Sequence, residues 1–193
     1  ISGEYISQPE QRIQKYKNSN RIDSYRLYNT NVFSFAFDEI ANENKNKNIL
    51  VIGNPPWVTN SGLGRTSGTN LPAKSNINNT RGIEAITGKG NFDIAESICN
   101  MMIDAFTRHP NTHIALLAKN SVINTILYRQ PLHPRHIQNL NQLSFDAKRV
   151  FNVSVAASLF ECHIGEHYQK QCTAYDFYTR QRSHIFGWVN DAF

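Results

Sequence analysis

Residues 49–57 read ILVIGNPPW, and this stretch decides how the rest of the chain is interpreted. Its first part, residues 49–53, is a continuous apolar segment of strand length, typical of a strand covered on both faces in a parallel sheet. The two prolines end that strand abruptly, because they remove two backbone donors and hold the chain in a stiff, extended turn. The pattern predicts a buried strand that delivers residues 54–57 to its carboxyl end.

Residues 54–57 carry groups suited to holding a planar amine. The side-chain oxygen of Asn54 and the carbonyl oxygen of Pro55 can both accept hydrogen bonds from one exocyclic NH2, and the Trp57 ring can stack on the attached ring system. Ligands of open α/β sheets bind beyond the carboxyl ends of strands, which favours this interpretation. The structural alternative is that Asn54 caps a turn, the prolines end a strand and Trp57 packs in the core.

The spacing of apolar residues predicts the elements that follow. A helix is expected over 92–108, with Asn91 as its cap, and a second buried strand over 113–118. Strand, helix and strand in this order indicate a crossover unit on a parallel sheet. A further helix is expected from Asn120. Further strands are expected over 137–146, 153–162 and 173–178, and the last two are expected to pair as an antiparallel hairpin. Upstream of residue 49, the pattern predicts a helix over 8–17, a strand over 26–37 and a solvated loop over 38–48.

Composition bounds the class of protein. The chain has 193 residues, 40% of them hydrophobic, and a net charge of +5, which is enough for one buried core and permits a polyanionic partner without requiring one. No run approaches the roughly 18 apolar residues of a membrane-spanning helix, and no signal-peptide pattern opens the chain. Three cysteines without a repeated spacing fit a reducing compartment, so we expect a cytoplasmic protein. The chain begins with Ile1, which suggests a piece of a longer protein.

Residues 58–90 are rich in Gly, Ser, Thr and Asn and show no sustained periodicity. A loop of this length is often functional. Its scattered cations are hypothesised to contact phosphates, although a solvated loop is at least as good an interpretation of each one. Residues 62–68 (GLGRTSG) have the spacing of a nucleotide-binding loop, but they do not end a strand, so we interpret them as a flexible loop. The cations are Arg65, Lys74, Arg81 and Lys89.

The segment 49–57 resembles motif IV of the amino-methyltransferases that use S-adenosylmethionine, above all the DNA adenine-N6 methyltransferases of restriction–modification systems. Further stretches follow in the order of that family. Residues 90–106 resemble its motif V helix, and residues 113–122 its motif VI, with Lys119 where many members have proline. Residues 148–162 (KRVFNVSVAASLFEC) resemble motif VIII, and residues 29–35 (NTNVFSF) resemble motif III.

The resemblance implies a fold, a reaction and a set of site residues. The fold is an α/β, Rossmann-like methyltransferase sheet, mostly parallel with an antiparallel terminal hairpin. The reaction is methyl transfer from S-adenosylmethionine to adenine N6 in double-stranded DNA, with the target base flipped out of the stack. The implied roles are catalysis for Asn54, Pro55, Pro56 and Trp57, contact with the base for Phe151, Asn120 and Ser121, and cofactor binding for Asn31, Val32, Phe92 and Asp93.

One departure from the family matters most. Neither its Gly-rich cofactor motif nor the acidic residue after its second strand is present in this sequence. We therefore expect residues 31–179 to be a partial catalytic domain, residues 1–30 a lead-in from an upstream part, and residues 180–193 the start of a following region. A cofactor-binding part and a target-recognition part are expected elsewhere in a longer chain. Alone, the chain is expected to bind S-adenosylmethionine weakly or not at all.

Other interpretations stay open at this point. The same amine-holding motif suits another planar nitrogen, in an RNA base or a protein glutamine. A noncatalytic nucleic-acid-binding or partner module is the alternative from a different class. A zinc site is not expected, because the available ligand types match no common spacing. Those ligand types are Cys162, His163, His167 and Cys172.

Overall fold

The computed structural model describes residues 4–19, 21–57 and 93–193, and the chain divides into two compact units, Ile1–Phe35 and Ala36–Phe193. In the first unit, helix α1 spans Glu4–Asn18 and a short 3-10 helix, η1, spans Val32–Ser34. The helix expected over 8–17 is confirmed.

The strand expected over 26–37 is wrong. The Asn31 side-chain oxygen accepts the backbone N–H of Phe33 at 3.0 Å, and the Asn31 carbonyl accepts that of Ser34 at 3.0 Å. Such local bonds offer the backbone an alternative to a strand ladder, so the chain turns at η1 instead.

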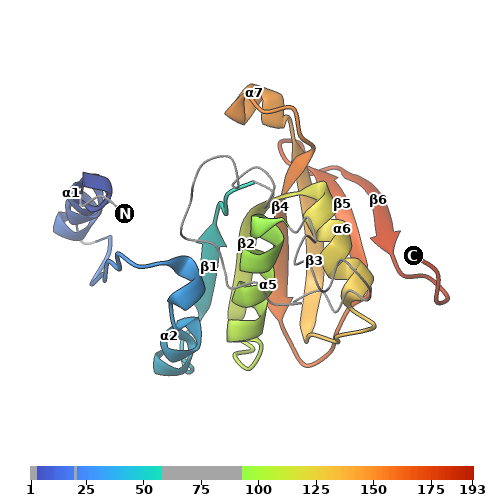
Figure 1. The fold of residues 1–193 in the computed structure, drawn as a ribbon, viewed down its shortest axis with the longest axis horizontal. Coiled ribbons are helices and arrows are strands. Elements are labelled where there is room, and N and C mark those ends of the chain that lie inside the picture. Colours follow the sequence, from blue (N-terminus) through green and yellow to red (C-terminus); the bar gives the residue numbers. More distant parts are fainter. Residues whose placement is uncertain (1–3, 20, 58–92) are drawn as a thin grey trace, which may run out of the picture. The chain divides into compact units, whose positions relative to one another are not determined.

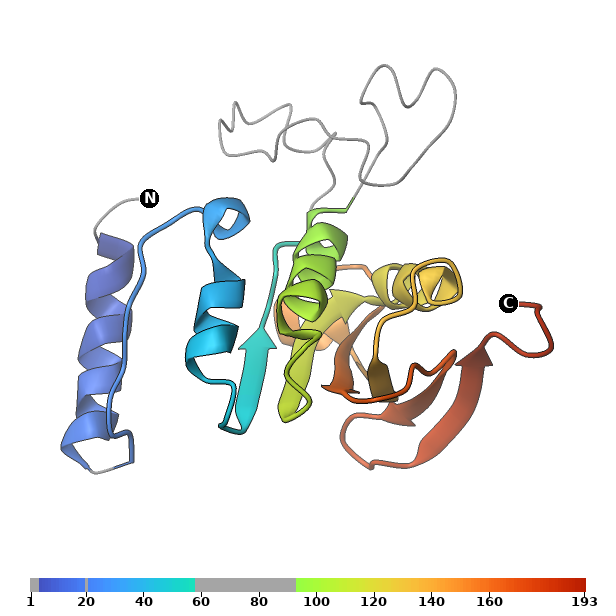
Figure 2. The same cartoon turned by 90° about the horizontal axis from the view of Figure 1, so that it is seen from below.

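The second unit is one mixed sheet with helices on one face. Its six strands are ordered β1-β2-β4-β3-β5-β6, and α5 and α6 lie together on one face, as the two views show (Figures 1 and 2). The elements are α2 (Phe37–Glu43), β1 (Ile49–Gly53), α5 (Ile94–Phe106), β2 (Thr112–Lys119), α6 (Asn120–Arg129), β3 (Ile137–Phe145), α7 (Ala147–Phe151), β4 (Ala157–Ile164), β5 (Gln171–Asp176) and β6 (Arg182–Gly187).

The predicted crossover unit is confirmed. β1 and β2 are parallel neighbours, with Gly53 opposite Leu116, and α5 lies between them in the chain. The cap of α5 differs from the expectation, because the side chain of Asp93, not that of Asn91, accepts the Ala95 N–H at 2.9 Å.

The hairpin expected between residues 153–162 and 173–178 is wrong. β4 lies between β2 and β3 and is antiparallel to both, whereas β5 is parallel to β3 and forms its hairpin with β6. A central position suits β4, because its buried residues alternate with half-buried ones. The sheet is accordingly mixed, with two parallel and three antiparallel pairs of neighbours. The expectation of a mostly parallel sheet is therefore not confirmed.

β1 is not covered on both faces, which corrects the expectation drawn from its apolar run. Leu50 and Ile52 are 64% and 75% exposed, and they alternate with half-buried neighbours. The core lies on the other face of the sheet, where Phe160 on β4 and Ile103 on α5 have no exposed surface.

Three described elements fall where no helix or strand was expected. α2 occupies the start of the expected loop over 38–48, α7 is a helix of one turn, and β6 extends the sheet beyond residue 180. Across the described ranges, no helix is both long enough and apolar enough to span a bilayer.

Candidate active site

Residues 54–57 leave β1 at the edge where β1 and β2 both end. Asn54 is exposed, Pro55 is buried and Trp57 is half-buried. The indole Nε1–H of Trp57 donates to the carbonyl oxygen of Leu117 on β2 at 3.2 Å. That bond anchors the ring over the neighbouring strand while the Asn54 side chain stays accessible, so the stretch is not sealed in the core.

Phe151 stands beside Trp57 although 94 positions separate them in the chain. Their ring centroids are 5.4 Å apart with an interplanar angle of 82°, an edge-to-face contact. α7 presents Phe151 there because the Asp146 side chain caps the helix through the Arg149 N–H at 3.0 Å, and Asn152 ends it in the left-handed region at φ 55°. Phe151 is 40% exposed, so a planar ligand can contact it.

Asn120 lies at the first position of α6, directly after β2, and a chain of hydrogen bonds orients it. Its Oδ1 accepts the hydroxyl of Ser158 at 2.8 Å, and Ser158 and Ser144 hydroxyl oxygens are 3.1 Å apart. Gln142 Nε2 donates to the Ser144 oxygen at 3.1 Å.

These bonds have a single direction. Ser158 has one hydroxyl hydrogen, which goes to Asn120, so Ser144 must donate to Ser158 and accept from Gln142. The Asn120 oxygen is thereby held on the Ser158 side, and its Nδ2 is presented as the donor end. Sequence reasoning did not find Gln142, Ser144 or Ser158, because only the register of β3 against β4 brings them together. Ser121, the next residue after Asn120, is exposed.

Asp93 and Lys119 form an ion pair between the start of α5 and the end of β2. One carboxylate oxygen of Asp93 caps α5 through the Ala95 N–H, and the other meets the Lys119 ammonium group. The two side chains are only 13% and 15% exposed, so the pair is shielded from salt more than a surface pair would be. Lys119 therefore holds the start of α5 against the end of β2.

The other residues singled out by sequence belong to the first unit or fall outside the described residues. Asn31 and Val32 lie in the first unit, in and next to η1. Phe92 and the stretch 62–68 fall outside the described residues, as do the four cations proposed to contact phosphates. Those cations are Arg65, Lys74, Arg81 and Lys89.

The four zinc-type ligands do not converge. Cys162 is buried on the helix-covered face, and its neighbour His163 is half-buried, because adjacent residues of a strand point to opposite faces. In the part of the chain that the structure describes, no three His, Cys, Asp or Glu side chains form a group able to hold a metal ion.

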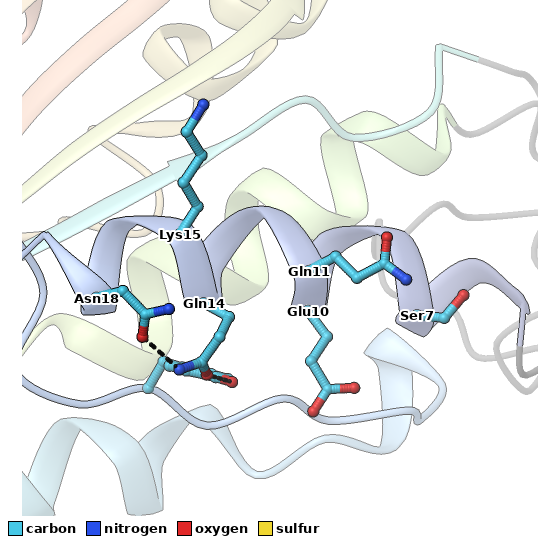
Figure 3. Close-up of a pocket in the computed structure, with 7 residues that line it drawn as sticks. Ser7, Glu10, Gln11, Gln14, Lys15 and Asn18 are labelled. Carbon is cyan, nitrogen blue, oxygen red and sulfur yellow. Dashed lines mark hydrogen bonds between the residues drawn. The ribbon is translucent and has the colours of Figure 1, made fainter.

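The first unit has a hollow of its own, on the surface of α1 (Figure 3). Tyr25 lines it and donates its hydroxyl to Gln14 Oε1 at 3.0 Å, and Gln14 Nε2 donates to Asn18 Oδ1 at 2.9 Å. The α1 side chains that line it are polar and exposed, and Tyr25 is its one aromatic lining residue.

Comparison with known proteins finds a methyltransferase and a restriction–modification enzyme. The chain is 43% identical over 122 residues to the type II methyltransferase M.NspV of Nostoc sp., a match that covers 61% of this chain and 24% of that relative. Its fold matches the structure of the Type IIL restriction–modification enzyme MmeI in complex with DNA, with a TM-score of 0.50 and 14% identity over 86% of this chain and 23% of that one. No protein-family model matches the chain.

Over the matched 122 residues, the chain is a homologue of a type II methyltransferase. The second unit is an α/β fold with a six-stranded mixed sheet that resembles part of MmeI. The chain spans about a quarter of the length of each of these two proteins.

Proposed function

We propose that this chain is the base-holding part of a DNA adenine-N6 methyltransferase of a restriction–modification system. The observation that carries the proposal is the position of Asn54–Trp57: they follow a sheet strand at its carboxyl end, with Phe151 5.4 Å from the Trp57 ring. The homology to a type II methyltransferase supports the same class of reaction.

Asn54 and Pro55 act on the exocyclic amine. The lone pair of adenine N6 is delocalised into the ring, which makes it a poor nucleophile. The Asn54 Oδ1 and the Pro55 carbonyl oxygen each accept a hydrogen bond from one N6–H group. These bonds draw the nitrogen toward tetrahedral geometry and stabilise its developing positive charge. N6 would attack the methyl carbon as the S–CH3 bond of the sulfonium breaks and leaves a neutral thioether. The proton lost from N6, which becomes acidic only as the new bond forms, would pass to water. Positioning supplies most of the acceleration, so no strong base is required.

Trp57 and Phe151 hold the ring of the base. Flipping a base out of a duplex costs a few kcal/mol, and contacts with aromatic side chains offset that cost. The hydrogen bond from the indole to Leu117 fixes the Trp57 ring before the base arrives, so little ordering entropy is lost on binding. Asn120, oriented by Ser158, and the exposed Ser121 complete the base pocket in this proposal.

Asp93, which the resemblance implies to be a cofactor-binding residue, is already engaged within the protein. It caps α5 and pairs with Lys119, and the Gly-rich cofactor motif of the methyltransferases that the sequence resembles is absent from the sequence. We place S-adenosylmethionine, which supplies the methyl group, on another part of a longer protein. The exposed Leu50 and Ile52 on β1 support this placement, because parallel neighbours such as β1 and β2 are normally covered on both faces.

The test uses the full-length protein, labelled S-adenosylmethionine and duplex DNA. Asn54→Ala is expected to abolish methyl transfer while DNA affinity stays largely intact. Asn111→Ala, an exposed asparagine beside the opposite end of β1, is the matched control and should leave transfer unchanged. Equal transfer by wild type and Asn54→Ala would refute the role of that amide.

The same assay separates the alternatives. Transfer to RNA or to protein glutamine instead of DNA would move the proposal to another planar nitrogen. Retained DNA binding without cofactor binding in calorimetry of the full-length protein would favour the noncatalytic module.

A further inference from the structure

A line of aromatic rings continues from the candidate site across the end of the sheet. Phe151 lies 5.9 Å from Phe145, Phe145 lies 6.0 Å from Phe177, and Phe177 lies 5.4 Å from Tyr178, all measured between ring centroids. The line therefore runs from α7, over the end of β3, to the turn between β5 and β6. It ends on Tyr178, which is 61% exposed.

The turn that carries Tyr178 is held rigidly. The Asp176 Oδ1 accepts the backbone N–H groups of Tyr178 and Thr179 at 2.9 and 2.7 Å and the Thr179 hydroxyl at 3.0 Å. These hydrogen bonds, chiefly those from Thr179, lower the pKa of the Asp176 carboxyl. Phe177 N–H donates to the Ser144 carbonyl at 2.9 Å, which ties the turn to β3. A preordered aromatic side chain loses little entropy when a ligand stacks on it.

Cations accompany the rings. The Arg180 guanidinium lies over the Phe177 ring at 5.0 Å from its centroid, a cation–π contact, and Arg180 itself is exposed. Lys148 and Arg149 on α7 are exposed, as is Arg182 at the start of β6. The carboxylates of Asp146 and Asp176 are exposed beside these four cations, and one oxygen of each accepts backbone N–H groups.

Aromatic faces combined with positive charge are the recognition chemistry of single nucleic-acid strands, in which bases stack on rings and cations meet phosphates. A purely structural role explains Phe145 and Phe177, which are half-buried, but it does not explain Tyr178. A protein partner would explain an exposed aromatic patch, but the excess of cations favours a polyanion.

We propose that this surface, formed by Phe151, Phe177, Tyr178, Arg180 and the α7 cations Lys148 and Arg149, binds a single DNA strand and takes the strand that flanks the extruded base. Tyr178 stacks on one base and Arg180 contacts a phosphate. The flanking position rests on the proposed function, because it places the target base at Asn54–Trp57. The capacity to bind a strand does not depend on methyl transfer.

The first experiment measures the affinity of the full-length protein for a fluorescein-labelled dT20 strand by anisotropy over a range of KCl concentrations. Tyr178→Ala is expected to weaken binding about 5- to 100-fold, and Tyr178→Phe to retain it, since stacking needs the ring. Arg180→Ala is expected to reduce the slope of log K against log salt by about 1. Tyr168→Ala and Arg108→Ala, exposed residues at the opposite end of the sheet, are the matched controls. Affinities of Tyr178→Ala and Arg180→Ala within twofold of the wild type would overturn the proposal.

A second measurement avoids substitution and so does not depend on the folding of variants. The wild-type protein is irradiated with a strand in which 5-iododeoxyuridine replaces thymidine, and the crosslinked peptides are mapped after trypsin digestion. Crosslinking within residues 171–180 is expected, and its absence there while other peptides crosslink would overturn the proposal.

The two proposals fail independently. If the wild type transfers no methyl group but binds the strand, and Tyr178→Ala weakens that binding, the proposed function is refuted and the strand-binding surface is supported. Transfer lost in Asn54→Ala with strand binding unaffected by Tyr178→Ala would do the reverse.

Discussion

Ser158→Ala tests the hydrogen-bond chain that orients Asn120. Ser158 has no exposed surface, and its hydroxyl joins Asn120 Oδ1 at 2.8 Å to Ser144 Oγ at 3.1 Å. The substitution leaves an acceptor on Asn120 and a donor on Ser144 without their partner. A buried group left unpaired costs about 1–3 kcal/mol. Because Asn120 is only half-buried, water recovers part of that cost, and we expect a total loss of about 1–3 kcal/mol in the free energy of unfolding.

The assay is urea unfolding of the longest available natural chain, followed by circular dichroism. Ser183→Ala is the matched control, because this serine lies on the exposed strand β6 and donates to the Ala174 carbonyl at 3.2 Å. It should change the free energy of unfolding by no more than about 0.5 kcal/mol. The double variant Ser158→Ala with Asn120→Ala should show a coupling of about 0.5–3 kcal/mol. A loss in Ser158→Ala no larger than in Ser183→Ala, or no coupling, would refute the chain.

Two further predictions concern titratable groups. Burial raises the pKa of the Cys99 and Cys172 thiols to about 12 and raises that of Cys162 as well. All three thiols should therefore resist alkylation by iodoacetamide at about pH 8 until urea unfolds the chain. Peptide mapping that finds them alkylated in the native protein at the rate of a free thiol would contradict this prediction. Burial lowers the pKa of His163, as does the His113 ring, whose centroid is 3.7 Å away. The unfolded chain therefore binds a proton at higher pH than the native protein does. The free energy of unfolding should accordingly fall as the pH drops below about 6.5. His163→Gln should flatten that dependence of the urea midpoint, and an unchanged dependence would count against the assignment.

The elements nearest the candidate site were readable from sequence because their signals are local. The apolar run of β1, the helical spacing in α5 and the run of β2 each specify an element without reference to the rest of the chain. Residues 54–57 were predicted to lie at the strand end for the same reason. The proximity of Phe151 to Trp57 came from the order of motifs, because 94 positions separate the two rings.

What sequence reasoning missed depends on distant partners. β6 is an exposed strand with no apolar alternation to mark it, and it exists because it pairs with β5. The place of β4 between β2 and β3 is a matter of pairing over long separations, which no local pattern encodes. The exposed face of β1 was missed because a run of apolar residues reads the same whether one face or both are covered.

β1 ends the strand order of the sheet, so one side of its backbone has no neighbouring strand among the described residues. An edge that combines open backbone groups with apolar side chains is a template on which identical chains can add strand to strand. The exposed side chains of Leu50 and Ile52 supply apolar surface next to these open backbone groups. Residues 1–193 produced alone should therefore self-associate through β1. Charged substitutions at Leu50 and Ile52 should reduce that association and keep the chain in solution.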